Sequence, residues 1–506
     1  MSATAPGDDV PIPPPLRGVA AFTLYLANLM VTLDMTVANV AVPHIAGNLG
    51  ATLDQGAWVI TSYVVAEAIT VPLTGWLVSR FGAVRLMLSC LFGFTFFSLM
   101  CGLSTTLPML VLCRIGQGLC GGPIMSLVQT LVTRLYRGPE LPKAYSIWTL
   151  TVMSGPAFGP ILGGTIADNW SWHWIFLINV PIGLACLIVG YLLLRPAETV
   201  RLRLPIDRLG LLLLVAWVAA LQLMLDTGRD KDWFADPGIV SLAGVAAICF
   251  CAFVIWELTE EHPAVNLRLL RNRPFALCIT ASSIVFSAHF CGIVVVPQWL
   301  QSTMGFSAQQ AGMTIASSAV GALIASQVTM FLLVRIDGRF VVTLGSLWAG
   351  IVVLLRTEWS TDLDFAHLAF MFGLQGFGVT MMVMALNTMS MDTISHDDTA
   401  SGVGLLNFIR TMGTAMSTAV VLTYWSEQQA SSREALVGSI EYGRAMDMMS
   451  RAGAGIGAES SVISSLVDRQ ASTLAMLQTF WVAGLAMFIG ALAIWAVPRI
   501  AMNRFK

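Results

Sequence analysis

The sequence predicts an all-α membrane protein, and three observations lead to that prediction. Of the 506 residues, 56% are hydrophobic and only 11% are charged, less than half of the roughly 25% charged residues of a soluble domain. One apolar run follows another, and most are close to the ~20 residues that a helix needs to cross a bilayer. The basic residues are also divided unequally between the two sets of connecting loops, as the positive-inside rule describes.

The apolar runs define fourteen candidate transmembrane helices, which fall into groups of six, two and six. Their approximate ranges are 18–42, 56–78, 84–104, 107–133, 144–167, 173–194, 209–227, 238–258, 275–298, 309–334, 340–356, 364–390, 400–424 and 474–497. Residues 1–17 are polar and rich in proline, so they predict a disordered N-terminus. The longest connection, at about 425–471, predicts a polar loop.

The basic residues predict the orientation. An even number of spans places both chain ends on one side, and the ends and loops of that side hold 18 of the 27 lysines and arginines. The opposite loops hold 7, among them Arg356, and the other two, Arg114 and Arg410, lie inside spans. The richer side is expected to be cytoplasmic, which places both termini there and the 425–471 loop in the periplasm.

A faint internal repeat predicts how the spans are grouped. Gln117-Gly118-Leu119-Cys120 returns as Gln375-Gly376-Phe377-Gly378, 258 residues later. The loop Val78–Gly82 returns as Val334–Gly338, 256 residues later. We therefore expect two six-helix bundles, at 18–200 and 263–506, with two inserted helices at 201–262. Parallel halves of this kind occur in the major facilitator architecture.

Ionisable residues inside the predicted spans are the first candidates for function, because a charge in a membrane is costly. Glu67 lies on a polar stripe with Tyr63, Thr70 and Thr74, spaced at helical intervals. Burial favours the protonated form of a carboxyl group, so such a group can take up a proton on one side and release it on the other. The alternative for Glu67 is a structural hydrogen bond or ion pair between helices.

Asp34 is the second carboxylate. Asn28, Thr32, Thr36 and Asn39 form one polar face of the first helix, and Asp34 points well away from it at 100° per residue. Proton coupling or substrate contact is one role for Asp34. An ion pair with an arginine such as Arg114 is the alternative, and it would oppose proton carrying.

Two arginines complete the set of buried charges. Arg114 shares a helix face with Gln117, Gly118, Gly121 and Met125, and it is predicted to couple protons together with Asp34 and Glu67. Arg410 shares a face with Asn407, Thr411 and Thr414, where a structural pairing remains the alternative. Polar side chains and flexible methionines suit a cavity for varied ligands. The candidate cavity residues are Asn28, Thr32, Tyr63, Gln117, Met125, His289, Gln375, Met382, Asn407 and Arg410.

A glycine- and proline-rich run occupies the fifth predicted span. Gly155, Gly159 and Gly163 repeat every four residues, which predicts a smooth ridge for close helix packing. Pro156 and Pro160 each remove a backbone donor and favour a bend, and Gly164 closes the run. The run serves either packing alone or packing that also seals one side of a transport path.

Several functions are excluded by what the sequence lacks. It contains no GxxxxGK[ST] loop for an ATP-driven pump and no HExxH motif. Its six histidines show no metal-ligand spacing and its nine cysteines form no CxxC pair. The net charge of −2 gives no sign of a nucleic-acid partner. We therefore expect no cofactor, no metal and no enzymatic activity.

The motifs resemble those of the EmrB/QacA-type fourteen-helix drug:proton antiporters of the major facilitator superfamily, and the resemblance extends from about Arg17 to Pro498. Trp172–Gly183 is specific to this branch, and Trp256–Pro263 is similar to EmrB-like members. The other matching segments are Leu33–Ala41, Gly75–Arg85, Arg114–Gly118 and Gly155–Gly164. In the second of these, Gly75, Arg80, Gly82 and Arg85 match the family's loop motif, whereas Ser79, Ala83 and Val84 depart from it.

The resemblance implies a function that the residues alone do not define. It implies export of lipophilic drugs, uncouplers, weak acids and sometimes fatty acids across the inner membrane, driven by the proton gradient. It also implies an EmrA-type periplasmic adaptor and a TolC-type outer-membrane channel as partners. A major facilitator permease dedicated to one metabolite or fatty acid is the alternative with the same fold, and the Gly155–Gly164 run argues against uptake of a small metabolite. A membrane-embedded lipid-modifying enzyme would need a nucleophile with a base, or a metal cluster, and neither is found.

Overall fold

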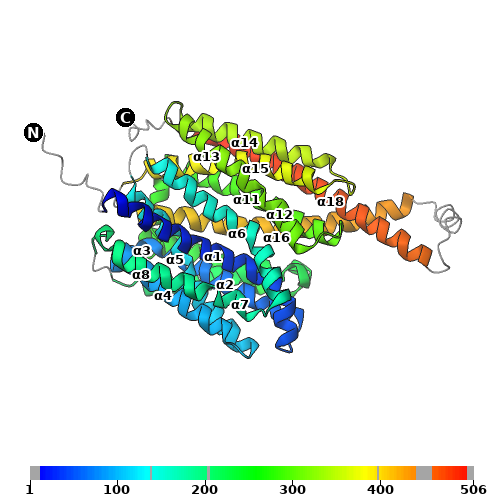
Figure 1. The fold of residues 1–506 in the computed structure, drawn as a ribbon, viewed down its shortest axis with the longest axis horizontal. Coiled ribbons are helices and arrows are strands. Elements are labelled where there is room, and N and C mark those ends of the chain that lie inside the picture. Colours follow the sequence, from blue (N-terminus) through cyan, green and yellow to red (C-terminus); the bar gives the residue numbers. More distant parts are fainter. Residues whose placement is uncertain (1–11, 137–139, 202–204, 396–397, 440–457, 499–506) are drawn as a thin grey trace, which may run out of the picture.

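A computed structural model of the chain describes residues 12–136, 140–201, 205–395, 398–439 and 458–498. Within these ranges every element of regular secondary structure is a helix. The long helices lie side by side along one axis of the molecule (Figure 1). The prediction of an all-α membrane protein is therefore confirmed.

The N-terminal half, as we call α1–α8, holds the first six predicted spans. The second span is bent by 60° between α2 and α3, where Pro72 interrupts the helix. The sixth span is divided between α7 and α8 just before Asn179. The helices are α1 (Pro14–Asn48), α2 (Leu53–Thr70), α3 (Thr74–Phe81), α4 (Ala83–Gly102), α5 (Leu107–Leu135), α6 (Leu141–Asn169), α7 (His173–Leu177) and α8 (Asn179–Leu193).

The two inserted helices are α9 (Arg208–Thr227) and α10 (Pro237–Thr259). Helix α9 contacts α2 of the N-terminal half and α16 of the C-terminal half, so it lies against both. Helix α10 packs mainly on α9 and exposes large apolar side chains such as Ile248 and Ile255. A helix with such an outer face is suited to contact with lipid.

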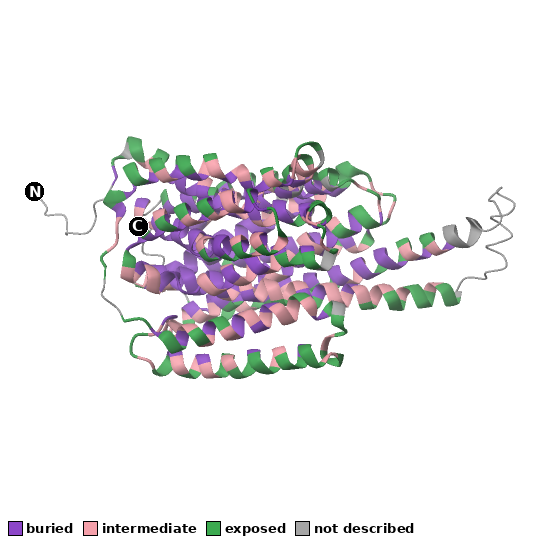
Figure 2. Ribbon diagram, turned by 90° about the horizontal axis from the view of Figure 1, so that it is seen from below, coloured by how far each residue is buried: buried purple, intermediate pink, exposed green. Residues whose placement is uncertain are grey.

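The C-terminal half consists of α11–α18. Its helices are α11 (Arg273–Ser302), α12 (Ala308–Ala316), α13 (Ser318–Leu333), α14 (Gly338–Leu355), α15 (Phe365–Asp392), α16 (Thr399–Ser439) and α18 (Ala458–Ala493). A short 3₁₀ helix, Arg356–Glu358, follows α14. Buried residues are concentrated in the middle of the molecule and exposed residues on its outer helices (Figure 2).

Each predicted span coincides with a helix or a divided helix, but the count of fourteen is not confirmed by apolarity. Among the described residues, twelve helices are long and apolar enough to cross a membrane, and the α2–α3 pair makes thirteen. The remaining predicted span is α6, which is 29 residues long. Several side chains of α6 lie outside the described residues, so its apolarity is not assessed with that of the other spans.

The prediction of a loop at 425–471 is wrong over much of this range, which is helical. Helix α16 continues to Ser439 and α18 begins at Ala458, so both helices extend past the bundle at the end opposite the start of α1 (Figure 1). From Trp425 to Val437 the chain contains no glycine or proline, so nothing in its backbone ends the helix. Residues 440–457 lie outside the described residues.

The prediction of disorder over residues 1–17 is wrong from Pro14 onward, because these residues are helical. Helix α1 begins at Pro14, because proline is favoured in the first turn, where its missing N–H has no partner to lose. Residues 1–11 lie outside the described residues, so the rest of that prediction is not tested.

Candidate functional site

A buried ion pair between Asp34 and Arg114 lies inside the N-terminal half. Arg114 Nη1 donates to Asp34 Oδ2 at 2.6 Å, and the side chains are 1% and 0% exposed. Gln117 Nε2 and Asn179 Nδ2 donate to the other carboxylate oxygen, at 3.0 and 2.8 Å. Asp34 therefore joins α1 to α5 and α8 through three donors.

Arg114 is equally well surrounded. Its Nε donates to the carbonyl oxygen of Val59 at 3.1 Å, and its Nη1 also donates to Gln117 Oε1 at 2.8 Å. The guanidinium carbon lies 4.2 Å from the ring centroid of Tyr63 and 5.4 Å from that of Phe176. A buried ion pair is stable only when further hydrogen bonds compensate the lost hydration, and this cluster supplies them.

Asn179 is the member of this cluster that was not predicted from the sequence. It bridges Asp34 to Ser98 Oγ, to which it donates at 3.1 Å. Asn179 stands within the Trp172–Gly183 motif, which was recognised only as a family signature. A polar side chain at the start of an otherwise apolar helix was the signal that could have identified it.

Glu67 lies beside this cluster but makes no direct bond to it. Its side chain is partly exposed, and it is within electrostatic range of both Arg114 and Asp34. Its backbone packs against α5, where Gly118 and Gly122 leave room for it. The predicted stripe is not continuous, because the bend at Pro72 places Thr74 in α3.

The predicted cavity residues Asn28 and Thr32 instead pack against α6. Asn28 Nδ2 donates to Thr151 Oγ1 at 2.9 Å, and Thr36 Oγ1 donates to the carbonyl oxygen of Gly155 at 2.9 Å. Thr32 Oγ1 reaches the carbonyl oxygen of Thr151 at 3.3 Å. This polar face of α1 therefore forms a seam between helices.

The glycines of α6 make that seam possible. A Cβ atom at Gly155 would lie 2.7 Å from the Thr32 backbone oxygen, and one at Gly163 would lie 2.7 Å from the Val37 oxygen. A Cβ at Gly159 would overlap the Thr36 hydroxyl. The predicted close-packing ridge is thus present, and α6 passes through Pro156 and Pro160 to Gly164 and beyond as one helix.

A second polar contact joins the two halves. Asn407 Nδ2 on α16 donates to Ser126 Oγ on α5 at 3.0 Å, and Arg410 Nη2 donates to Asn407 Oδ1 at 2.6 Å. The Arg410 guanidinium lies 4.5 Å from the Phe286 ring centroid, and its Nη1 has no hydrogen-bond partner in the described part of the chain. Met125 lies beside Ser126 on α5 and is partly buried.

The remaining predicted cavity residues lie inside the C-terminal half. Gln375 Nε2 and His289 Nδ1 are 3.2 Å apart, and Ser346 Oγ contacts Met382 Sδ at 3.7 Å. Near them lies Arg356, which is 0% exposed. Arg356 was predicted to lie in an outer loop, and that prediction is wrong because the side chain is buried in the bundle at the end of α14.

The loop motif is organised around a carboxylate from another segment. Glu198 accepts hydrogen bonds from the backbone N–H groups of Val84 and Arg85, at 3.0 and 3.2 Å. It thereby supplies negative charge at the start of α4, where it is favourable. Gly82 has φ of +89° and a Cβ there would overlap Glu198, so glycine is required at that position.

Of the other loop-motif residues, Gly75 contacts the C-terminal half and Arg85 lies on the surface. A Cβ at Gly75 would lie 2.5 Å from Ser401 on α16, so this glycine allows α3 and α16 to touch. Arg80 lies over the rings of Trp76 and Phe81, and Arg85 is exposed.

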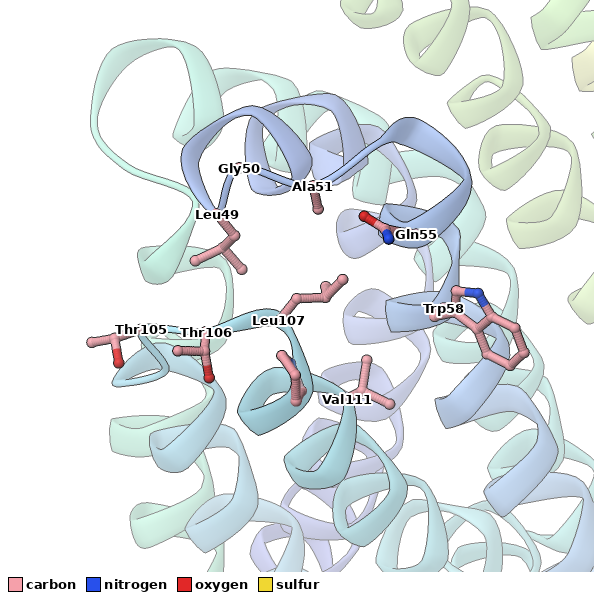
Figure 3. Close-up of a pocket in the computed structure, with 10 residues that line it drawn as sticks. Leu49, Gly50, Ala51, Gln55, Trp58, Thr105, Thr106, Leu107 and Val111 are labelled. Carbon is pink, nitrogen blue, oxygen red and sulfur yellow. The ribbon is translucent and has the colours of Figure 1, made fainter.

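Two cavities among the described residues lie away from the predicted cavity residues. One, of about 470 Å³, is formed where the α1–α2 and α4–α5 connections meet, and Gln55, Trp58, Leu107 and Val111 are among its lining (Figure 3). The other, of about 400 Å³, lies between α2, α9 and α16 and is lined by Val64, Gln222 and Asp226 among others. The predicted cavity residues themselves are divided among the N-terminal half, the contact between the halves and the C-terminal half.

Comparison with known sequences matches this chain to major facilitator proteins. Residues 24–418 match the family model of the Major Facilitator Superfamily. The multidrug export protein EmrB of Escherichia coli K12 is 38% identical over 431 residues, 84% of this chain and 84% of that protein. The fatty acid resistance protein FarB of Neisseria gonorrhoeae is 38% identical over 421 residues, covering 82% of this chain and 83% of FarB.

Comparison with solved structures supports the fold. The proton:xylose symporter XylE, a major facilitator protein, aligns over 96% of each chain with a TM-score of 0.58 and 14% sequence identity. At that identity the similarity concerns the arrangement of helices alone.

Proposed function

This chain belongs to the major facilitator superfamily and to its family of EmrB multidrug export proteins, and from that premise we propose that it uses the proton gradient to export lipophilic toxic compounds by alternating access. Its many apolar helices make it a multi-pass membrane protein. The observation that best supports proton coupling is the buried Asp34–Arg114 pair. Charged side chains inside membrane spans are costly, and those that occur there usually have a function.

Proton uptake at Asp34 would change the contacts between three helices. The ionised carboxylate accepts charge-assisted hydrogen bonds, which are roughly twice as strong as neutral ones. Protonation removes the charge that holds Arg114 and weakens the link from α1 to α5. Arg114 then retains Gln117, the Val59 carbonyl and the Tyr63 ring as neighbours. The pair thus has two states, and they differ by one proton.

The α1–α6 seam offers a route from this pair to the C-terminal half. Helix α1 is held against α6 by Thr32 and Thr36. Helix α6 in turn contacts α12 and α13. A shift of α1 relative to α5 would therefore be transmitted across the boundary between the halves, which is the movement that alternating access requires.

Glu67 provides a second acidic group for this function. It is partly exposed, and no hydrogen bond or ion pair of its carboxylate is found among the described residues. We propose that Glu67 attracts the positive charge of cationic substrates, because it lies beside the coupling pair and adds negative potential there.

The extension formed by the ends of α16 and α18 is the proposed docking site for a periplasmic adaptor. It protrudes from the bundle opposite the start of α1 and the end of α18 (Figure 1). Arg433 Nε and Asp468 Oδ1 link its two helices at 2.7 Å, and both side chains are about half exposed. With cytoplasmic termini, as the basic residues predict, this extension faces the periplasm. An outer-membrane channel would complete the assembly.

A drug-susceptibility panel tests the proposed function. Cells lacking the gene and cells overexpressing it are compared against lipophilic cations, neutral drugs, uncouplers and weak acids, with accumulation of a fluorescent drug measured before and after the gradient is collapsed. Overexpression should lower accumulation only while the gradient exists. Accumulation that is unaffected by the gradient would contradict proton coupling.

A crosslinking experiment tests the docking surface. A photoreactive residue is placed at Glu434 on the exposed extension, and a matched one at the exposed Phe340 on the other end of the bundle. The adaptor should be captured only from position 434. Equal capture from both positions would show that the extension is a plain connection.

A further inference from the structure

Arg356 is a buried arginine that lacks an acidic partner. It lies at the end of α14, and its side chain is 0% exposed. Its guanidinium is enclosed by aromatic rings, with Phe372 4.2 Å, Trp359 5.2 Å and Phe480 6.0 Å from the guanidinium carbon. These rings exclude water from the group and stabilise part of its charge.

The hydrogen-bonding capacity of Arg356 is mostly unused. Its Nη2 donates to the carbonyl oxygen of Met371 at 3.2 Å. Its Nε and Nη1 have no partner, and no carboxylate pairs with it within the described ranges. An uncompensated buried charge is strongly unfavourable, so this site is incomplete as it stands.

Open space lies next to the unpaired nitrogen. A Cβ atom built on Gly292 would meet nothing within 4 Å except Arg356 Nη1, at 3.9 Å. His289 stands one turn earlier on the same helix, within electrostatic range of Arg356, and contacts Gln375. Gln375 Oε1 is a further polar atom without a partner, and rotating this amide by 180° would present a second donor.

The internal repeat shows which group is missing. Gly292 follows Asp34 by 258 residues, the interval that also separates Gln375 from Gln117. In the N-terminal half, a carboxylate at this position pairs with a buried arginine and with that glutamine. In the C-terminal half the glutamine is present, and the position of the carboxylate is held by glycine. The buried arginine comes from another position, because Phe372 stands where the repeat would place the counterpart of Arg114 and Arg356 approaches from the end of α14.

We propose that the C-terminal half contains a buried binding site for a monovalent anion, held by Arg356 beside Gly292 with His289 and Gln375 around it. An anion beside Gly292 accepts a charge-assisted hydrogen bond from Nη1 and compensates the buried positive charge of Arg356. The candidate anions are chloride and the carboxylate group of an organic acid. This site is separate from the Asp34 pair, and its existence does not depend on the proposed export activity.

The test measures the thermal unfolding of the full-length protein purified in detergent. Chloride replaces the bulkier isethionate at constant ionic strength, and acetate and decanoate are titrated in the same way. In the wild type the unfolding midpoint should rise and saturate with chloride or with a carboxylate. Saturation by decanoate at a concentration at least about tenfold below that of acetate identifies an amphiphile's carboxylate, whereas equal saturation by chloride and acetate identifies a small anion.

Variants assign the effect to this site. Gly292→Asp supplies the missing carboxylate, so its midpoint should no longer respond to anions and should equal or exceed that of the saturated wild type. Gly438→Asp, at an exposed glycine with open space around it, should keep the full response. Arg356→Gln should lose the response to anions if this variant folds. If Arg356→Gln does not fold, the response of Gly292→Asp is the test of the proposal. An absent response in the wild type, or an unchanged response in Gly292→Asp, would overturn the proposal.

Discussion

Two arginines of this protein are 0% exposed, one in each half, and of these two only Arg114 is paired with an acid among the described residues. In the N-terminal half Arg114 meets Asp34 at 2.6 Å. In the C-terminal half Arg356 meets aromatic rings and an empty space beside Gly292. Asp34 can exchange a proton, so the proposed coupling belongs to the N-terminal half, whereas the unpaired Arg356 suits the C-terminal half to the proposed anion.

Packing, in contrast, is similar in both halves. Gly155 and Gly163 bring α6 against the backbone of α1. In the C-terminal half, a Cβ at Gly345 would lie 2.8 Å from the Gly378 oxygen on α15, and one at Gly376 would overlap Ser318 on α13. Close contact through glycine is therefore found in both halves, whereas an acid–arginine pair with both side chains fully buried is described only in the N-terminal half.

Replacement of Arg114 is expected to have the largest effect. Arg114→Ala leaves Asp34 buried without its charged partner, and breaking such a pair costs about 3–5 kcal/mol. Drug efflux in whole cells should fall by roughly 100-fold or more, since about 1.4 kcal/mol corresponds to a factor of ten. Arg114→Lys should recover little, because lysine cannot reproduce the planar guanidinium that contacts Asp34, Gln117 and Val59. Wild-type efflux by Arg114→Lys would mean that a positive charge alone is sufficient.

The shared packing can be tested at Gly159. Gly159→Ala places a methyl group against the Thr36 hydroxyl, and such overpacking costs about 1–3 kcal/mol. The unfolding midpoint of the purified protein should fall, and transport should fall with it. Gly244→Ala on α10 is the matched control, because a Cβ there meets nothing within 4 Å. Equal stability of both variants would show that the α1–α6 seam is loose.

Replacement of Glu67 tests whether a second acid of the N-terminal half contributes to transport. Glu67→Gln should lower the transport of a lipophilic cation by roughly 3- to 10-fold, as expected for the loss of about 1 kcal/mol of attraction at a partly exposed site. Transport of a neutral or acidic compound should change less. The measurement uses inverted vesicles with one cationic and one anionic substrate. Equal losses for both would assign Glu67 to structure and leave coupling to Asp34 alone.

The smallest effect is expected in the extension of α16 and α18. Arg433→Ala removes the exposed pair with Asp468, and exposed ion pairs contribute about 0.2–1 kcal/mol. Stability should change by no more than that, and the change should shrink at high salt. Hydrogen exchange of the extension, measured with Asp468→Ala and the double variant, provides the check. A loss of several kcal/mol would show that this contact holds the two helices together.

Much of the fold could be predicted because the bilayer imposes a simple pattern on the sequence. Every predicted span coincides with a helix, since each run of apolar residues must satisfy its backbone internally. The 425–471 region was misjudged because helix continuation outside the membrane depends on the absence of breakers and not on apolarity. Such a helix has no hydropathy signal.

The candidate site was predicted only in part. Asp34, Arg114 and Gln117 were identified, because a charge or amide within an apolar run is conspicuous, but their pairing required the structure. Asn179 and Glu198 come from distant segments, and no spacing along the chain relates them to their partners. Arg356 was placed outside the bundle, because a position at the end of a helix does not define the direction of its side chain.

Drug-driven proton movement in reconstituted vesicles tests the central claim most directly. Purified wild type, Asp34→Asn and the control Asp362→Asn, at an exposed acid outside the cluster, are each placed in vesicles with a pH gradient and an internal pH dye. Addition of a drug should release protons through the wild type and through Asp362→Asn, whereas Asp34→Asn should give no drug-dependent pH change, because an amide cannot carry the proton. Drug-dependent proton movement by Asp34→Asn at the wild-type rate would contradict the assignment of coupling to the Asp34–Arg114 pair.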